Sequence, residues 1–134
     1  MSEWNDKVIE ELRANGGTAP SMGGAPLLIL HSVGAKSGQE RLSPLLYRER
    51  GDDLVIFASY AGAPTNPAWF HNLVANPDVT VEVGGETRAV RARVADRAER
   101  DELYEWNKQD YDTFAEYEAK TDRKIPVVIL EPVG

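Results

Sequence analysis

The stretch that decides the fold is VTVEVGGETRAVRARVA, residues 79–95. Apolar and polar residues alternate on both sides of Gly84 and Gly85, which is the pattern of two half-buried strands joined by a tight turn. A Gly-Gly pair supplies the positive φ angles that such a turn needs. Strands joined in this way pair antiparallel, so this stretch predicts an antiparallel sheet.

Four further stretches have the composition of strands. They are PLLILHSV at 26–33, SPLLYRER at 43–50, DDLVIFASY at 52–60 and IPVVILEP at 125–132. Gly51 and Asp52 separate the second from the third and predict another tight hairpin. Six mostly antiparallel strands with helices at the margins predict an α+β fold, a small closed or partly open β-barrel with peripheral helices.

Helical patterns occupy the segments between these strands. Residues 1–15 predict an amphipathic helix, since Trp4, Val8 and Leu12 recur at four-residue spacing, and residues 16–26 form a Gly- and Pro-rich linker. NPAWFHNLVANP at 66–77 predicts a short helix with Asn66 as N-cap and Pro67 as its first residue.

Two more helices are expected near the C-terminus. Asp96 and Glu99 resemble a capping box that opens a helix through about Asn107. YDTFAEYEAKTDRK at 111–124 is expected to continue helically before the last strand.

Length and composition limit the classes of protein. The 134 residues fit a single domain, 1–134, and 42% hydrophobic residues are enough for a core. The absence of cysteine excludes disulfides and thiolate chemistry, and no metal site is suggested by the spacing of the other ligand types. A net charge of -7 argues against nucleic-acid binding. No stretch resembles a secretory signal or a membrane span, so we expect a cytoplasmic protein without an integral membrane segment.

The turn between the first two strands is locally positive in this acidic chain. Residues 31–47, HSVGAKSGQERLSPLLY, carry Lys36, Ser37 and Arg41. Ala35 stands where a phosphate-binding P-loop needs glycine, so that motif is rejected. Glycines still allow backbone N–H groups to converge on an anion, with the two cations and a hydroxyl beside them. The alternative is an ordinary solvated hairpin loop.

Small residues follow the third strand in FASYAGAPTNPAWFHNL, residues 57–73. Ala58, Ser59, Ala61 and Gly62 allow a flat ring to approach the backbone, as in flavin-type cofactor sites. The alternative is that these residues are small because other parts of the protein pack closely against them. Trp69 lies in the helix that comes next and belongs either to the core or to a pocket wall.

An aromatic-rich stretch lies in the C-terminal helices. Its members are Tyr104, Trp106, Tyr111, Phe114 and Tyr117. Helical spacing of this kind is typical of a packing stripe, and the alternative is the wall of a pocket for a flat apolar substrate. His31 and His71 are expected to be structural.

Together these stretches resemble the deazaflavin-dependent nitroreductase family. The resemblance rests on LLILHSVGAKSGQERLSPLLY, VIFASYAGAP, NPAWFHNLVANPDVTVEVGG, RARVA and AKTDRKIPVVILEP, which cover residues 27–134 almost continuously in the order of the family. These actinobacterial proteins are split β-barrels of the FMN-binding type that use the deazaflavin coenzyme F420. The resemblance implies an oxidoreductase that passes hydride from reduced F420 to a quinone, nitro compound or activated alkene, and a single deazaflavin-binding domain.

The resemblance also implies the site residues. Those matching the part that binds the coenzyme phosphate are Lys36, Ser37, Gly38, Arg41, Ser43 and Pro44. Those matching the ring-facing strand end, loop and helix are Ala58, Ser59, Gly62, Ala63, Pro67, Trp69, Asn72 and Leu73. Candidate catalytic hydroxyls are those of Ser59, Tyr60 and Tyr111, and the substrate pocket is assigned to Trp69, Tyr111, Phe114 and Tyr117.

Two departures from the family pattern affect the substrate half. Family members often carry Lys followed by two Gly where this chain has Tyr60, Ala61 and Gly62. Phe114 stands where the nitroreductase branch uses a substrate-binding Tyr, which argues against activation of nitroimidazoles. The alternatives are an FMN-dependent split-barrel reductase and a non-catalytic F420 carrier. A small-molecule hydride acceptor is the expected partner, and peripheral contact with quinone-bearing membranes stays open.

Overall fold

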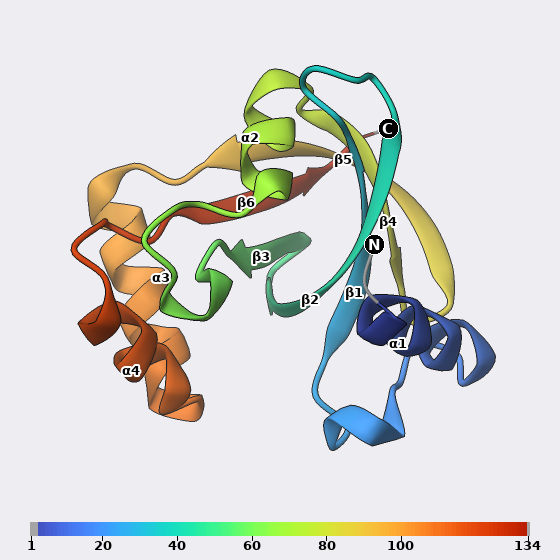
Figure 1. Cartoon of the computed structure of the whole chain (residues 1–134), viewed down its shortest axis with the longest axis horizontal. Helices are drawn as coiled ribbons and strands as arrows, with labels where there is room; N and C mark the ends of the chain where they lie inside the picture. Colours follow the sequence, from blue (N-terminus) through green and yellow to red (C-terminus); the bar gives the residue numbers. More distant parts are fainter. Residues whose placement is uncertain (1–2, 134) are drawn as a thin grey trace.

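A computed structural model describes the backbone of residues 3–133 and the side chains of residues 5–133. Six antiparallel strands close into one barrel in the order β1-β2-β3-β6-β5-β4. Their bounds are β1 Leu27–Val33, β2 Glu40–Arg50, β3 Asp53–Phe57, β4 Asp78–Val83, β5 Glu86–Val94 and β6 Val127–Pro132. The α+β barrel predicted from the sequence is confirmed, and Figure 1 shows the arrangement of its strands.

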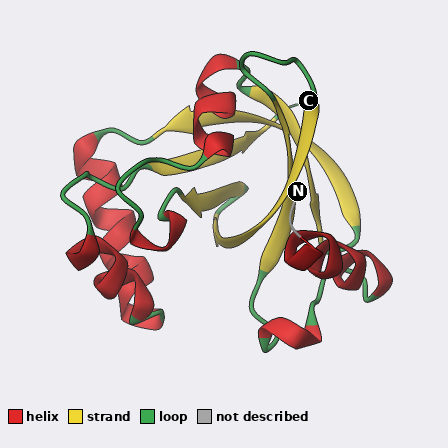
Figure 2. Ribbon diagram, in the orientation of Figure 1, coloured by secondary structure: helices red, strands yellow, loops and turns green. Residues whose placement is uncertain are grey.

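The helices cover the outside and one end of the barrel. Their bounds are α1 Glu3–Ala14, α2 Ala68–Ala75, α3 Arg97–Asp110 and α4 Thr113–Lys120, with short 3-10 turns η1 at Pro20–Met22 and η2 at Tyr60–Gly62. Helices α3 and α4 lie together on one side, α1 lies on another, and α2 sits above the barrel end (Figures 1 and 2). Within residues 3–133, no helix has the length and apolar character needed to cross a bilayer. Trp4, part of the predicted amphipathic stripe, lies outside the described side chains.

Strand β2 is shared between two neighbours. Its residues 40–46 pair with β1, and its residues 47–50 pair with β3. Within residues 3–133, the N-terminal half of β2 pairs with β1 alone, because β3 pairs only with residues 47–50 of β2. The other edge of this half of β2 is therefore not covered by a strand of the described chain.

Alternation along the strands separates two packing faces. Leu28 and Leu30 point into the barrel, where Trp69 and Leu73 of α2 close the end of the core. Ile29, between the two leucines in sequence, belongs instead to the cluster under α1. A third cluster joins β3 and β6 to α3 and α4. The period of two in the sequence thus determines which residues of β1 and β2 face the interior.

Several predicted boundaries are corrected. Helix α2 begins at Ala68 with Pro67 as its N-cap, so the assignment of Asn66 as N-cap is wrong by one residue. The Asn66 Oδ1 accepts a hydrogen bond from Arg123 Nη1 at 2.7 Å instead. The third strand ends at residue 57 rather than 60, and the last helix ends at residue 120 rather than 124. The segments that follow them contact each other through Asn66 and Arg123.

Other boundaries hold or lengthen. The Asp96 carboxylate accepts a hydrogen bond from the Glu99 N–H at 2.9 Å, which confirms the predicted cap of α3. The Glu99 side chain pairs with Arg50 and Arg93 at 2.7 Å, so it does not complete a capping box. Helix α3 runs to Asp110, three residues beyond the predicted end, and strand β2 starts at residue 40 rather than 43.

Candidate functional site

The turn between β1 and β2 is closed by its own backbone. The Gly34 N–H donates to the Gln39 carbonyl at 2.8 Å, and the Gly38 N–H donates to the Gly34 carbonyl at 2.9 Å. Gly38 has a φ of 69°, a conformation that favours glycine. Lys36 and Ser37 are exposed at the tip of this turn. The backbone of the turn is therefore held by its own hydrogen bonds, and both side chains are exposed to solvent.

Two cations near this turn have no acidic partner. Lys36 and Arg41 are exposed, and neither takes part in an ion pair among residues 5–133. Arg41 lies opposite Ser32 and Ser43 lies opposite Leu30, on the interior face of the barrel. In a chain with a net charge of -7, two free cations on one turn form a local anion-attracting region.

The remaining predicted residue of β2 faces elsewhere. Pro44 lies opposite Ile29, whose side chain packs under α1. Paired residues of an antiparallel ladder share a face, so Pro44 is directed to the α1 side and not to the side of Ser43. The structure thus separates Pro44 from the other residues that match the phosphate site.

Asn72 joins helix α2 to the β1–β2 turn. Its Oδ1 accepts a hydrogen bond from the Ala35 N–H at 3.0 Å, and its Nδ2 donates to Ser32 Oγ at 3.4 Å. One turn later, Asn76 Nδ2 donates to the Val33 carbonyl at 3.2 Å. The buried Asn72 amide is engaged within the protein, so it positions the turn that carries Lys36.

The other predicted residues of this helix are largely inside. Trp69 is 8% exposed and Leu73 is 2% exposed, and both belong to the barrel core. Pro67 is buried as well. These residues fix the helix on the barrel end, and Trp69 offers only a narrow edge to solvent.

The segment after β3 adopts an unusual backbone. Tyr60 and Ala61 have φ values of 47° and 52°, which side chains other than glycine rarely adopt. Gly62 follows with a φ of 79°, and a Cβ there would lie 3.0 Å from the Tyr117 carbonyl oxygen. Ala58 is buried, whereas Tyr60 is 57% exposed. Glycine is therefore required at position 62 by the contact with α4, and the Tyr60 side chain is exposed.

Arg123 holds this segment and was missed by the sequence reasoning. Its guanidinium donates to the carbonyl oxygens of Ala58 at 3.1 Å, Ser59 at 2.7 Å and Ala63 at 2.8 Å, besides Asn66. It lies in a charged run, DRK at 122–124, which gave no signal of a special role. Only the three-dimensional arrangement shows that one arginine joins both ends of residues 58–66.

The aromatic stretch divides into a core and a border. Phe114 is 7% exposed, and its ring centroid lies 5.7 Å from Phe57, 6.1 Å from Tyr104 and 5.4 Å from Tyr117. Tyr104 donates to the Phe114 carbonyl at 2.7 Å, and burial raises the pKa of Tyr104 to about 12. Phe114 and Tyr104 are thus core residues.

Half-buried tyrosines border this cluster. Tyr111 packs against Phe114 with ring centroids 6.2 Å apart, and Tyr117 lies on the side of Gly62. Lys120 Nζ also donates to the Ala61 carbonyl at 3.4 Å. The structure therefore brings the aromatic border beside the segment 58–63, and it brings helix α2 beside the β1–β2 turn.

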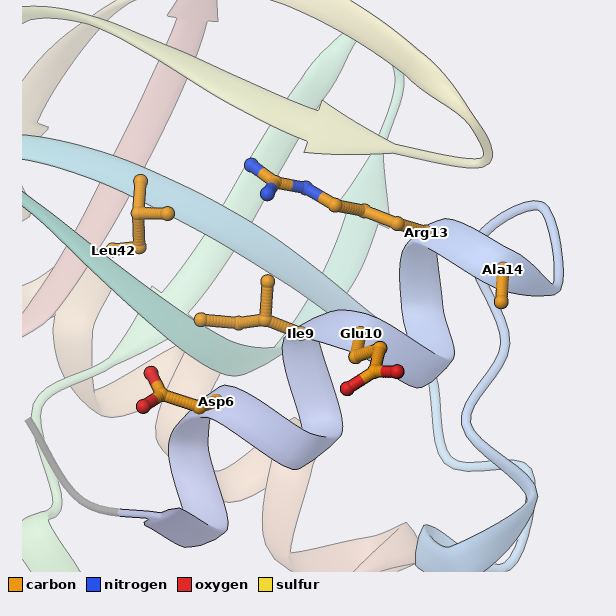
Figure 3. A pocket seen from close by; sticks show the side chains of 6 residues that line it. All are labelled: Asp6, Ile9, Glu10, Arg13, Ala14 and Leu42. Carbon is orange, nitrogen blue, oxygen red and sulfur yellow. The ribbon is translucent and has the colours of Figure 1, made fainter.

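A surface depression lies apart from this site. It is an open hollow between α1 and β2 (Figure 3), and the residues that line it are Asp6, Ile9, Glu10, Arg13, Ala14 and Leu42. None of the residues predicted to bind cofactor or substrate lines it. The candidate site therefore rests on the residues around residues 34–41 and 58–73.

Comparison with known proteins gives a consistent result. The family model described as F420H(2)-dependent quinone reductase matches residues 4–132. An F420H(2)-dependent quinone reductase of Mycobacterium tuberculosis is 40% identical over 111 residues, covering 81% of this chain and 74% of the relative. A solved structure of an F420-H2 dependent reductase (FDR-A) is 37% identical with a TM-score of 0.71, covering 79% of this chain and 94% of that one. Another, described as a domain-swapped dimer, is 33% identical with a TM-score of 0.73, covering 96% and 98%.

Proposed function

The chain belongs to the F420H(2)-dependent quinone reductase family, and on that premise we propose that it transfers hydride from reduced coenzyme F420 to a quinone. The observation that carries the proposal is the family match over residues 4–132, nearly the whole chain. Nitro compounds and activated alkenes share the electron-poor character of a quinone, and we include them as further acceptors to be tested. A cytoplasmic location stays a prediction.

The cations of the β1–β2 turn fit the phosphate of the coenzyme. Lys36 and Arg41 are exposed and free of carboxylates among the described side chains, so no ion pair has to break before an anion binds. Ser37 Oγ already accepts from the Gln39 N–H at 3.2 Å, which leaves its own hydroxyl proton for an anion. Ser43 shares the interior-facing side of Arg41, which supports a role for both toward one ligand.

The segment after β3 fits a flat ring. Ala58, Ser59, Gly62 and Ala63 present little side-chain bulk, and the segment is held in place by Arg123. Bound reduced F420 supplies the hydride, so the protein needs no nucleophile or metal for that step. The role of these residues is to orient the ring and exclude water from one of its faces.

Hydroxyl groups near this segment are candidates for the proton that accompanies reduction. Tyr60 is exposed next to Ser59, and Tyr111 and Tyr117 border the aromatic cluster. Phe114 is enclosed by other rings, so we assign it to the rear wall of the substrate pocket. Trp69 is assigned to the edge of the same pocket through its small exposed area.

The test is a fluorescence titration with oxidised F420 beside FMN, followed by mixing the preferred reduced cofactor with menadione. Micromolar or tighter binding of F420, with oxidation faster than in protein-free solution, supports the reductase. Preference for FMN contradicts the cofactor assignment. Binding of F420 without turnover contradicts the enzymatic function and supports a coenzyme carrier.

A further inference from the structure

Residues 58–66 form a loop whose two ends are fastened by a single side chain. Arg123 Nη2 and Nη1 reach Ser59 and Ala58 at the start of the loop, at 2.7 and 3.1 Å. Its Nε reaches Ala63 near the other end at 2.8 Å. A planar guanidinium is suited to this because its donors point in fixed directions. Arg123 therefore joins the start of the loop to its later part.

Arg123 is also a half-buried cation without a counter-ion. Its four acceptors are neutral oxygens, and it pairs with no carboxylate in the part of the chain that the structure describes. Burial lowers the pKa of its guanidinium. A cation held in this way is costly unless an anion comes close to it.

Two peptide groups of the loop lie between Arg123 and the opposite side of the loop. The carbonyl oxygens of Ala58 and Ser59 face Arg123, so the N–H groups of the same peptides, those of Ser59 and Tyr60, point away from it. Neither N–H donates to another atom of residues 5–133. A cation on the carbonyl side polarises a peptide and strengthens its N–H as a donor.

We propose that Arg123 is a positioning residue that fixes the Ala58–Asn66 loop and, through the Ser59 and Tyr60 peptides, favours the anionic form of a ring bound against this loop. This inference rests on the proposed function, because that ring is the deazaflavin of F420. Its carbonyl oxygens gain negative charge when the ring ionises, and polarised amide donors stabilise such oxygens. Arg123 thus acts on the coenzyme without touching it.

Two substitutions separate the charge of Arg123 from its hydrogen bonds. Arg123→Lys keeps the charge and loses the forked set of donors, whereas Arg123→Met loses both. Arg97→Met is the matched control, since Arg97 is an exposed cation on α3 that makes no ion pair among the described residues. The measurements are the affinity for oxidised F420, by fluorescence, and the pH at which the absorption of bound F420 reports ring ionisation.

We expect both Arg123 variants to bind F420 on the order of tenfold more weakly, because the loop against the ring loses the forked hydrogen bonds that fix it. In Arg123→Met the ionisation midpoint of the bound ring should rise by about one pH unit toward that of the free coenzyme. Arg123→Lys should keep most of the wild-type midpoint, and Arg97→Met should behave like wild type.

Different results overturn different statements. If Arg123→Met weakens binding but leaves the midpoint at the wild-type value, the side chain only supports the loop and the proposed charge effect is wrong. Unchanged affinity in both variants rejects the positioning role altogether. Failure of the wild-type protein to bind F420 refutes the proposed function itself, and with it this role of Arg123. Should Arg123→Met not fold, the midpoint of Arg123→Lys decides, since a value equal to that of free F420 contradicts the charge effect.

Discussion

Removing the two free cations of the β1–β2 turn gives the sharpest test of where F420 binds. In Lys36→Ala with Arg41→Ala, a phosphate loses two attractive charges, and no ion pair within residues 5–133 is broken by the change. The turn itself is closed by backbone hydrogen bonds of Gly34 and Gly38, so the fold should be unaffected. The double substitution therefore changes binding without changing stability.

The expected size follows from the exposure of both side chains. Two unit charges at about 4 Å interact by roughly 1 kcal/mol in water, and exposed side chains are close to this limit. Two such contacts amount to about 2 kcal/mol, which corresponds to an approximately thirtyfold weaker Kd at low salt. Because the Debye length shrinks from about 10 Å at 0.1 M to 3 Å at 1 M salt, the difference should nearly vanish at high salt.

The assay is a fluorescence titration with oxidised F420 at low and high salt. The matched control is Lys7→Ala with Arg97→Ala, which removes the same net charge from exposed positions of α1 and α3. The control should retain the wild-type affinity. A change of less than threefold in Lys36→Ala with Arg41→Ala, or an equal loss in the control, refutes the assignment of the phosphate to this turn.

Three further predictions concern the frame that holds the site. Arg13 and, to a smaller extent, His31 lower the pKa of Glu82 from 4.5 to about 2. This carboxylate therefore contributes about 3 kcal/mol to the free energy of unfolding above pH 5, and that contribution is lost as the pH falls toward 2. Urea unfolding of Glu82→Gln should depend less on pH in this range, and a pH dependence identical to that of the wild type would reject the stabilising role of these pairs. Gly62→Ala should lower the free energy of unfolding by about 1–3 kcal/mol more than Gly84→Ala, because both glycines have a positive φ but only Gly62 lies against the backbone of α4. Equal midpoints of thermal unfolding in the two variants would disprove this contact. Phe114→Tyr should lower the free energy of unfolding, measured with urea, by about 1–3 kcal/mol, because the new hydroxyl is buried among aromatic rings. Unchanged stability would mean that the hydroxyl reaches a polar group.

Local signals in the sequence determined most of the strands, and they also predict where the site lies. Gly84 and Gly85 between alternating residues predicted the β4–β5 hairpin, and the structure pairs Val83 with Glu86 across that turn. Asp96 was correctly predicted as the cap of α3. Charge near a glycine-containing turn is visible in sequence and predicts Lys36 and Arg41 as partners of an anion; both are exposed in the structure, and their role stays a prediction. Such features involve residues close in the chain, so their physical causes can be recognised there.

Only the tertiary structure decided how distant segments meet. Arg123 contacts residues 57 to 65 positions away, and no periodicity or motif indicates which carbonyl oxygens a lone arginine will reach. The Asn66 side chain bonds to Arg123 instead of capping α2, which begins at Ala68, and α4 ends at Lys120, three residues before Arg123. Phe114 and Tyr117 are three residues apart on one helix, yet the first is enclosed by rings and the second lies beside Gly62. Burial and long-range hydrogen bonds depend on closure of the whole barrel, and a sequence pattern reports only the face on which a residue lies.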